Sequence, residues 1–120
     1  MSDPVPAQER RAQLDRLIDS LSRLVAILRC DSQCQWTAHF EQMLHDGQRI
    51  ATSSQLIDLS AYSSAVMHVF GGAGSFNDYF PGRYDSLTGR IVPIPGTEDY
   101  ERTARQVAEQ ASELRVVGRR

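Results

Sequence analysis

The residues best suited to chemistry lie together at positions 70–81, which read F-G-G-A-G-S-F-N-D-Y-F-P. Three of four consecutive residues are glycines, and glycine-rich backbone can bind phosphate through its N–H groups where a helix begins. Here the glycines follow a helical pattern, and all basic residues are arginine, so the lysine of a phosphate-binding loop is missing. We therefore expect a structural turn and not a nucleotide site. Its residues are Gly71, Gly72, Gly74 and Ser75.

Aromatic and arginine side chains gather in residues 71–96, a stretch with no helical period. It holds half of the eight Phe and Tyr residues, and aromatic and arginine side chains often dominate the binding energy of protein interfaces. An irregular connection of this length is also unusual in a compact domain and is often functional. We expect a partner-binding surface here, with some rings displayed and others sealing the end of the domain. Its residues are Phe76, Asn77, Asp78, Tyr79, Phe80, Arg83, Tyr84 and Asp85. The sequence leaves open whether Asn77 and Asp78 bind a partner or only cap a turn.

The side chains that could bind metal or transfer protons are scattered along the chain. A zinc site needs four converging ligands, but the two cysteines have the unfavourable spacing C-x3-C and the histidines project elsewhere on a helix. We therefore expect neither a metal nor a cofactor. The ligands considered are Cys30, Cys34, His39 and His45.

One acid–base pair, His68 with Asp78, would serve a small hydrolase or transferase. No serine lies in the G-x-S-x-G context of a hydrolase nucleophile, because Gly74-Ser75 lacks the strand that must precede it. Since no catalytic group of residues stands out, we expect a protein that is not an enzyme.

Composition and charge narrow the function further. The chain has 120 residues, of which 41% are hydrophobic and 23% charged, and its net charge is −2, as expected for one globular domain. It lacks the excess of basic residues that is typical of nucleic-acid-binding proteins. No apolar run approaches the roughly 18 residues that a membrane span requires. The first residues lack the features of a signal peptide. We therefore expect a cytoplasmic protein with reduced cysteines that binds neither nucleic acid nor membrane.

Four amphipathic patterns predict the helices that must position these residues. They cover residues 7–29, about 32–50, about 53–70, and 97 onward. Ser32 and Gln35 have the spacing of a capping box, and Thr97 is a candidate N-cap. Gly47 is expected to weaken the second helix enough to break it near residues 45–48.

The predicted fold is all-α: a four-helix bundle-like single domain over residues 7–120, preceded by a disordered tail at residues 1–6. A long irregular loop separates the third and fourth helices. Within it, residues 90–94 read as a short extended segment that proline would confine to an edge. The predicted core residues are Leu17, Leu21, Leu24, Leu28, Trp36, Phe40, Leu59, Val66, Phe70, Val107 and Leu114.

A tryptophan early in the second helix, a glycine soon after it and a G-G-x-G-S-F-N-D run closing the next helix form a distinctive combination. They are Trp36, Gly47 and residues 71–78. Over residues 14–80 the chain resembles a family of small uncharacterised bacterial helical proteins that stand alone and have no assigned enzyme activity. Small domains of this kind often occur beside secreted polymorphic toxins as immunity proteins, and the resemblance implies that role for this chain. Residues 84–120 do not match the family pattern, so their role is open.

These observations favour a non-enzymatic cytoplasmic binding protein whose partner is a cognate bacterial toxin. The loop 76–90 and an adjoining helix face would cover the active site or the substrate surface of the toxin. Asp78 and Asp85 would pair with basic groups of an enzyme that binds nucleic acid or nucleotide. The alternative is a helical structural or regulatory subunit that forms a homodimer through the helix at residues 7–29. Charges placed at Leu21 and Leu24 would disrupt that dimer. The sequence leaves the chemistry of the toxin and the oligomeric state open.

Overall fold

The computed structural model shows a helical bundle with a small sheet at one end, and the structure describes residues 7–53, 59–71 and 76–115. Residues 1–6, the expected tail, lie outside the described residues, as do Gly72, Gly74 and Ser75 of the expected turn. The elements in chain order are α1 (Ala7–Leu28), α2 (Thr37–Ala51), α3 (Leu59–Met67), the 3-10 helix η1 (Phe76–Asp78), β1 (Gly82–Asp85), β2 (Arg90–Pro93) and α4 (Tyr100–Arg115).

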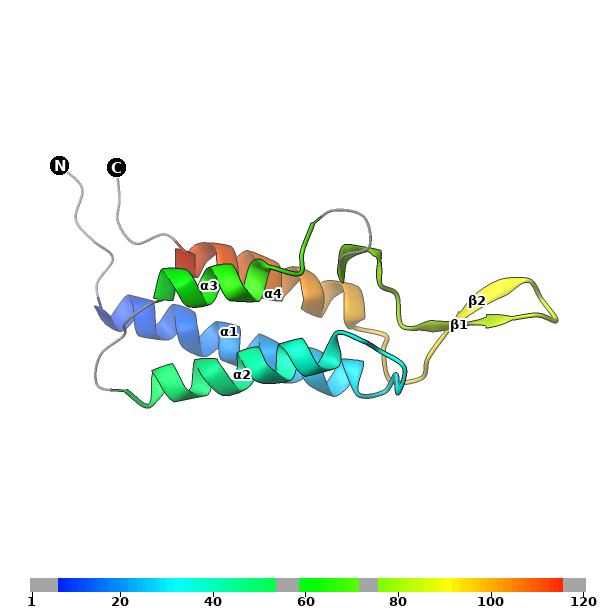
Figure 1. The fold of residues 1–120 in the computed structure, drawn as a ribbon, viewed down its shortest axis with the longest axis horizontal. Coiled ribbons are helices and arrows are strands. Elements are labelled where there is room, and N and C mark those ends of the chain that lie inside the picture. Colours follow the sequence, from blue (N-terminus) through cyan, green and yellow to red (C-terminus); the bar gives the residue numbers. More distant parts are fainter. Residues whose placement is uncertain (1–6, 54–58, 72–75, 116–120) are drawn as a thin grey trace.

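The helices pack as an antiparallel ring (Figure 1). Helix α1 packs against α2 and α4, and α3 closes the ring by packing against α4 and, less extensively, against α2. The ends where α1 begins and α4 finishes lie together, opposite the end that carries the sheet (Figure 1). Within the described ranges, no helix is long and apolar enough to span a bilayer.

The core lies between the helices and follows the apolar stripe of α1. Leu14, Leu17 and Leu21 have no exposed surface, because spacings of three and four residues place them on one helix face. Trp36 and Phe70, both predicted core residues, are only partly buried and pack against the edge of this core. The other predicted core residues are confirmed as buried: Leu17, Leu21, Leu24, Leu28, Phe40, Leu59, Val66, Val107 and Leu114.

Gly47 does not break α2, contrary to the sequence-based prediction. The helix runs from Thr37 to Ala51, and Gly47 is buried within it. A Cβ atom at this position would lie 2.4 Å from Oη of Tyr62 and 3.2 Å from Cγ1 of Ile18. The glycine thus leaves room for Tyr62, whose hydroxyl donates to the backbone carbonyl of Met43 at 2.6 Å. Close packing between α2 and α3 outweighs the low helix propensity of glycine.

The capping box predicted at Ser32 is wrong, because α2 begins later, at Thr37. The residue before it, Trp36, provides no side-chain cap. Ser32 lies instead in a turn closed by Asp31, whose carboxylate accepts the backbone N–H of Gln33 at 3.0 Å. A carboxylate that accepts from the second residue after it is typical of a turn, and it competes with helix formation.

The start of α4 is also later than predicted, at Tyr100 in place of Thr97. The hydroxyl of Thr97 is buried and donates to the carbonyl of Ile94 at 2.6 Å, so it does not cap the helix. The backbone carbonyl of Thr97 accepts the N–H of Tyr100 at 3.1 Å, which forms a turn ahead of the helix.

Helix α3 ends at Met67, three residues before the predicted end at Phe70. Gly71 then adopts φ +112°, a backbone conformation that glycine reaches without the strain of a side chain. Beyond residues 72–75, the N–H of Phe76 donates to the carbonyl of Val69 at 2.8 Å. This contact returns the chain to the end of α3 and places Phe76 over the end of the bundle.

An antiparallel hairpin replaces part of the irregular loop, so the prediction of an all-α fold is wrong in this stretch. Strand β1 pairs with β2 in the register Gly82↔Pro93 through Asp85↔Arg90. The extended segment predicted at residues 90–94 is confirmed as β2, whereas β1 was not predicted. The hairpin projects away from the bundle, and the molecule measures 61 × 28 × 19 Å (Figure 1).

Candidate functional site

The hairpin arm, residues 80–93, is rich in exposed apolar side chains. Leu87 is 94% exposed and Tyr84 is 67% exposed. In the part of the chain that the structure describes, all large hydrophobic side chains that are about half exposed or more lie in this arm: Phe80, Tyr84, Leu87, Ile91 and Val92. Soluble proteins rarely leave such side chains together in water.

One face of the arm is apolar. Tyr84 and Ile91 are directly opposite each other in the ladder, so their side chains project from the same face. A Cβ atom on Gly82 would lie 2.6 Å from Cγ2 of Ile91 and 2.9 Å from Cε2 of Phe80. Gly82 therefore lets the Phe80 ring and Ile91 come together across the strand. The face is a continuous strip of Phe80, Ile91 and Tyr84.

The other face of the arm alternates with the first and is mostly charged. Arg83 is opposite Val92 in the ladder, and Asp85 is opposite Arg90. Arg83 lies at the base of the arm, and its guanidinium donates to the carboxylate of Asp31 in the loop between α1 and α2. Arg90 lies at the outer end and is exposed. The arm is therefore amphipathic across its thickness.

The outer turn of the arm is built around Asp85. Its two carboxylate oxygens accept the N–H of Leu87 and the hydroxyl of Thr88, each at 3.0 Å. The N–H of Gly89 donates to the carbonyl of Asp85 at 2.8 Å, and Gly89 has φ +69°. A left-handed glycine closing such a turn is a standard hairpin connection. The turn holds Leu87 at the tip, in water.

The Asp31 cluster, made of Asp31, Tyr79 and Arg83, joins the base of the arm to the loop between α1 and α2. The Tyr79 hydroxyl donates to Oδ2 of Asp31 at 2.6 Å, and Nη2 of Arg83 donates to Oδ1. With the Gln33 N–H, the carboxylate accepts from three donors. Asp31 is 5% exposed, whereas the Arg83 side chain is 42% exposed.

Electrostatics keep this cluster in one protonation state at neutral pH. The hydrogen bond from Arg83 lowers the pKa of Asp31 to about 2, against the opposing effect of burial. Burial raises the pKa of Tyr79, and its hydrogen bond to Asp31 raises it further. Asp31 is therefore ionised and Tyr79 protonated, so the hydroxyl donates and the carboxylate accepts.

Phe76 seals the end of the bundle directly behind the arm. It is 1% exposed, and its ring stacks on Tyr79 with centroids 5.8 Å apart. It also makes edge or tilted contacts with the rings of Trp36, Phe40, Phe70 and Tyr100. This aromatic cluster gives the arm a packed base.

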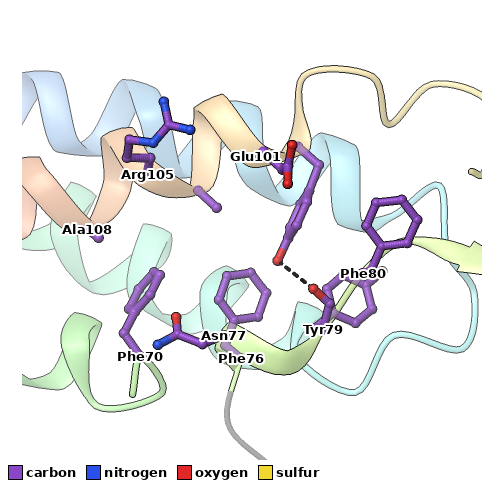
Figure 2. A pocket seen from close by; sticks show the side chains of 10 residues that line it. Phe70, Phe76, Asn77, Tyr79, Phe80, Glu101, Arg105 and Ala108 are labelled. Atoms are coloured by element: carbon purple, nitrogen blue, oxygen red, sulfur yellow. Dashed lines mark hydrogen bonds between the residues drawn. The ribbon is translucent and has the colours of Figure 1, made fainter. Parts of the chain in front are cut away.

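An open pocket of about 390 Å³ lies between η1 and the first half of α4. Figure 2 shows the side chains that line it. Aromatic rings line it, and the Tyr100 hydroxyl donates to the carbonyl of Tyr79 at 3.3 Å at one edge. Ala104 and Ala108 present only methyl groups on α4, so space remains beside the rings. The lining residues are Phe70, Phe76, Asn77, Tyr79, Phe80, Tyr100, Glu101, Ala104, Arg105 and Ala108. Phe80 belongs to both the pocket and the arm, so an apolar group docked on the arm can extend into the pocket.

The structure divides the predicted partner-binding residues into two groups. The exposed residues are Asn77, Asp78, Phe80 and Tyr84. The residues whose side chains serve the fold are Phe76, Tyr79, Arg83 and Asp85. Of the predicted turn residues, only Gly71 is described, and it has the positive φ that favours glycine.

Sequence reasoning missed four residues of this region: Asp31, Leu87, Ile91 and Val92. A signal for the last three existed, because Asp85 and Gly89 frame a turn between two short runs containing aromatic and β-branched residues. Asp31 had no such signal. A lone aspartate in a loop reads as solvated unless its partners, 48 and 52 residues away, are known.

The described histidines and cysteines differ in exposure. His68 is exposed at the end of α3. Burial lowers the pKa of His39, and the charge of nearby His68 lowers it further. Cys30 is an exposed free thiol and Cys34 a partly buried one. Residues 7–53, 59–71 and 76–115 contain no group of three or more His, Cys, Asp or Glu that could hold a metal ion.

Comparison with known proteins places part of the chain beside a family. Residues 29–86 match a family described as a domain of unknown function, DUF6966. The matched segment contains the Asp31 cluster and β1, and it ends before β2 and α4. Neither the curated proteins nor the solved structures include a match to this chain.

Proposed function

We propose that this protein is a non-enzymatic binding protein that docks on another protein through the hairpin arm. The partner is a cognate bacterial toxin in the cytoplasm, which the protein neutralises as an immunity protein by covering the active site of the toxin. The observation that carries this proposal is the concentration of exposed apolar side chains on the arm, Tyr84, Leu87 and Ile91 above all.

The free energy lost by leaving apolar side chains in water supports a partner for this surface. Burial of apolar surface stabilises by about 25 cal/mol per Å², so side chains left in water on a projecting arm forgo that gain until a partner covers them. The bundle buries the residues of its own apolar stripes, whereas the arm leaves its large apolar side chains in water. Tyrosine and arginine are enriched in binding hot spots, and the arm exposes Tyr84 and Arg90.

The shape of the arm supports occlusion as the mechanism. Each four-residue strand extends about 13 Å, at roughly 3.3 Å per residue, which suits insertion into a cleft. Asp78 is exposed on η1, two residues before the arm, and the proposal keeps its expected role of pairing with basic groups of the partner. Asp85 contributes differently from the sequence-based expectation, because its carboxylate shapes the turn that presents Leu87.

A homodimer through α1 receives less support. Leu21 and Leu24, the residues of that alternative, have no exposed surface in the single chain. A dimer through this stripe would therefore require the bundle to open. Light scattering on the purified protein decides the point, because the proposed immunity function predicts a monomer before the partner is added.

The test is affinity purification of a tagged copy from the native host, followed by mass spectrometry. We expect the wild type to recover a toxin domain. The double variant Tyr84→Ser and Ile91→Ser should lose it. The matched control is Glu109→Ser with Arg115→Ser on the exposed side of α4, which should recover the partner normally.

Co-expression then tests neutralisation. Cells producing the recovered toxin should survive with the wild type and the α4 control variant but not with the arm variant. Loss of partner in the α4 control, with full binding by the arm variant, would contradict the proposal. Recovery of the protein alone, as a stable dimer, would favour the homodimer hypothesis over the immunity function.

A further inference from the structure

We propose that Asp31 is a positioning residue that fixes the direction of the hairpin arm relative to the bundle, so that the arm is held ready for its partner. The inference rests on the proposed function for its biological meaning. The positioning itself can be measured on the isolated protein.

The contacts of Asp31 reach both the arm and its approach. Tyr79 is the residue before the arm, and Arg83 is the second residue of β1. Both donate to the two oxygens of one carboxylate, which the Gln33 N–H holds in place within its own loop. A carboxylate with donors on both oxygens has little freedom to rotate. The base of β1 is therefore tied at two points to the loop between α1 and α2.

The outgoing end of the arm meets the same loop. Gly96 has φ +91°, and a Cβ atom on it would lie 2.9 Å from Sγ of Cys30. Between Gly96 and the arm, the N–H of Ile94 donates to the carbonyl of Pro81 at 2.9 Å and closes the ladder at its base. Residues 30–31 thus lie against Arg83 at the base of the arm and against Tyr79 and Gly96 on its two flanks. The loop between α1 and α2 therefore supports the base of the arm, and the Asp31 cluster supplies the charged contact between them.

The cluster is placed to orient the arm and not to hold the bundle together. The helices pack through their apolar stripes, which include neither Asp31 nor Arg83, whereas the ring of Tyr79 packs against the edge of the core. The loop between α1 and α2 lies at the end of the bundle that carries the arm (Figure 1). A two-stranded hairpin is marginally stable alone, so its order depends on such attachments. Holding a binding segment in its bound direction lowers the entropy lost on association.

The first test compares Asp31→Asn with wild type by 15N relaxation of the isolated protein. The amide keeps the shape of the side chain but loses its charge and one of its two acceptor oxygens, so the ion pair with Arg83 is lost and the donors of Tyr79 and Arg83 can no longer each have an oxygen. We expect the amides of β1 and β2 to gain fast motion while those of α1 to α4 stay unchanged. The control is Asp46→Asn on α2, a carboxylate that accepts from Gln42 and Arg49 without contact to the arm. It should leave the arm unchanged.

The second test separates positioning from direct contact once the partner is in hand. If the arm of Asp31→Asn spends about one tenth of its time in the binding direction, the apparent affinity falls about tenfold through slower association. Ile91→Ser should instead speed dissociation, because it removes a contact made in the complex. Equal association rates for Asp31→Asn and wild type would overturn the inference.

The outcomes distinguish this inference from the proposed function. Unchanged arm amides in Asp31→Asn overturn the positioning role and leave the partner question untouched. If Asp31→Asn unfolds the protein, Tyr79→Phe decides, since it removes one bond to Asp31 and keeps the ring stacked on Phe76. Greater arm motion in that variant supports the inference, and an unchanged arm contradicts it. Failure to recover any partner with wild type counts against the proposed function alone.

Discussion

On α1 the residues Leu14, Leu17 and Leu21 have no exposed surface, whereas on the hairpin arm Tyr84 and Leu87 expose most of theirs. This difference in exposure arises because the two regions differ in the number of packed layers of secondary structure. A helix in a ring of helices has neighbours on its apolar side, but a two-stranded sheet that projects from the bundle has no second layer to cover either face. Apolar residues therefore stabilise the bundle, and on the arm they are available to a partner.

The two regions are consequently held by different forces. The bundle depends on burial of apolar side chains, which has no preferred direction. The arm depends on polar contacts at its two ends, the Asp31 cluster at the base and the Asp85 turn at the tip. Polar contacts are directional, so they set where the arm points.

The largest expected contrast comes from the same substitution in both regions. Leu24→Ala should reduce the free energy of unfolding by about 2–5 kcal/mol, because it leaves a cavity in the core. Leu87→Ala should change it by less than about 0.5 kcal/mol, because the side chain is already in water. Urea denaturation of both variants measures the two values. Comparable losses would mean that the arm is part of the cooperative core.

Gly47→Ala tests the close packing inside the bundle. Alanine is normally the better helix former, by roughly 1 kcal/mol. Here the added Cβ would lie 2.4 Å from Oη of Tyr62, so we expect a net destabilisation of about 1–3 kcal/mol from overpacking. Thermal unfolding gives the sign, and a stabilised variant would show that α2 and α3 separate easily. Tyr62→Phe in the same background should relieve most of the clash.

Gly89→Ala tests the turn of the arm with a smaller effect. No atom lies within 4 Å of the position that the added methyl group would take, so the cost is the positive φ alone, about 1 kcal/mol. We expect faster hydrogen exchange in β1 and β2 and an unchanged unfolding temperature for the bundle. Slower exchange in the arm would contradict the turn geometry.

The smallest expected effect concerns pH. The pKa of Asp31 is lowered in the folded protein, so its contribution is complete above the unfolded value near 4 and is lost as pH falls toward 2. The groups facing it, Arg83 and Tyr79, keep their protons throughout this range. We therefore expect arm amide shifts to stay constant between pH 7 and pH 5 and to move only in stronger acid. An NMR titration that shows movement near pH 6 would place another group in control.

Sequence periodicity predicted the bundle well for a physical reason. Each helix buries one face, so residues such as Leu17 and Leu28 repeat at helical spacing and can be recognised without knowing their neighbours. The predicted helix ends were poorer, because Ser32 and Thr97 have the chemistry of caps but act in turns fixed by Asp31 and Ile94.

The arm was harder to predict because its structure depends on pairing. Residues 90–94 have an extended pattern in the sequence, but Gly82 and Arg83 do not. Their strand is recognised only from its pairing with β2 in the structure. The role of Asp31 depends on residues about fifty positions away and has no local sequence signature. The prediction that Gly47 breaks α2 was wrong for the same reason. The glycine leaves room for the Tyr62 side chain of α3, which the local sequence does not reveal.

The central claim is that a partner covers the apolar face of the arm. Hydrogen exchange of the complex recovered from the native host measures this at each backbone amide. We predict slowed exchange at Tyr84 and Ile91 and across the turn at residues 86–89, with α1 to α4 largely unchanged. Slowed exchange on the outward surfaces of the helices, with the arm exchanging as in the free protein, would contradict it.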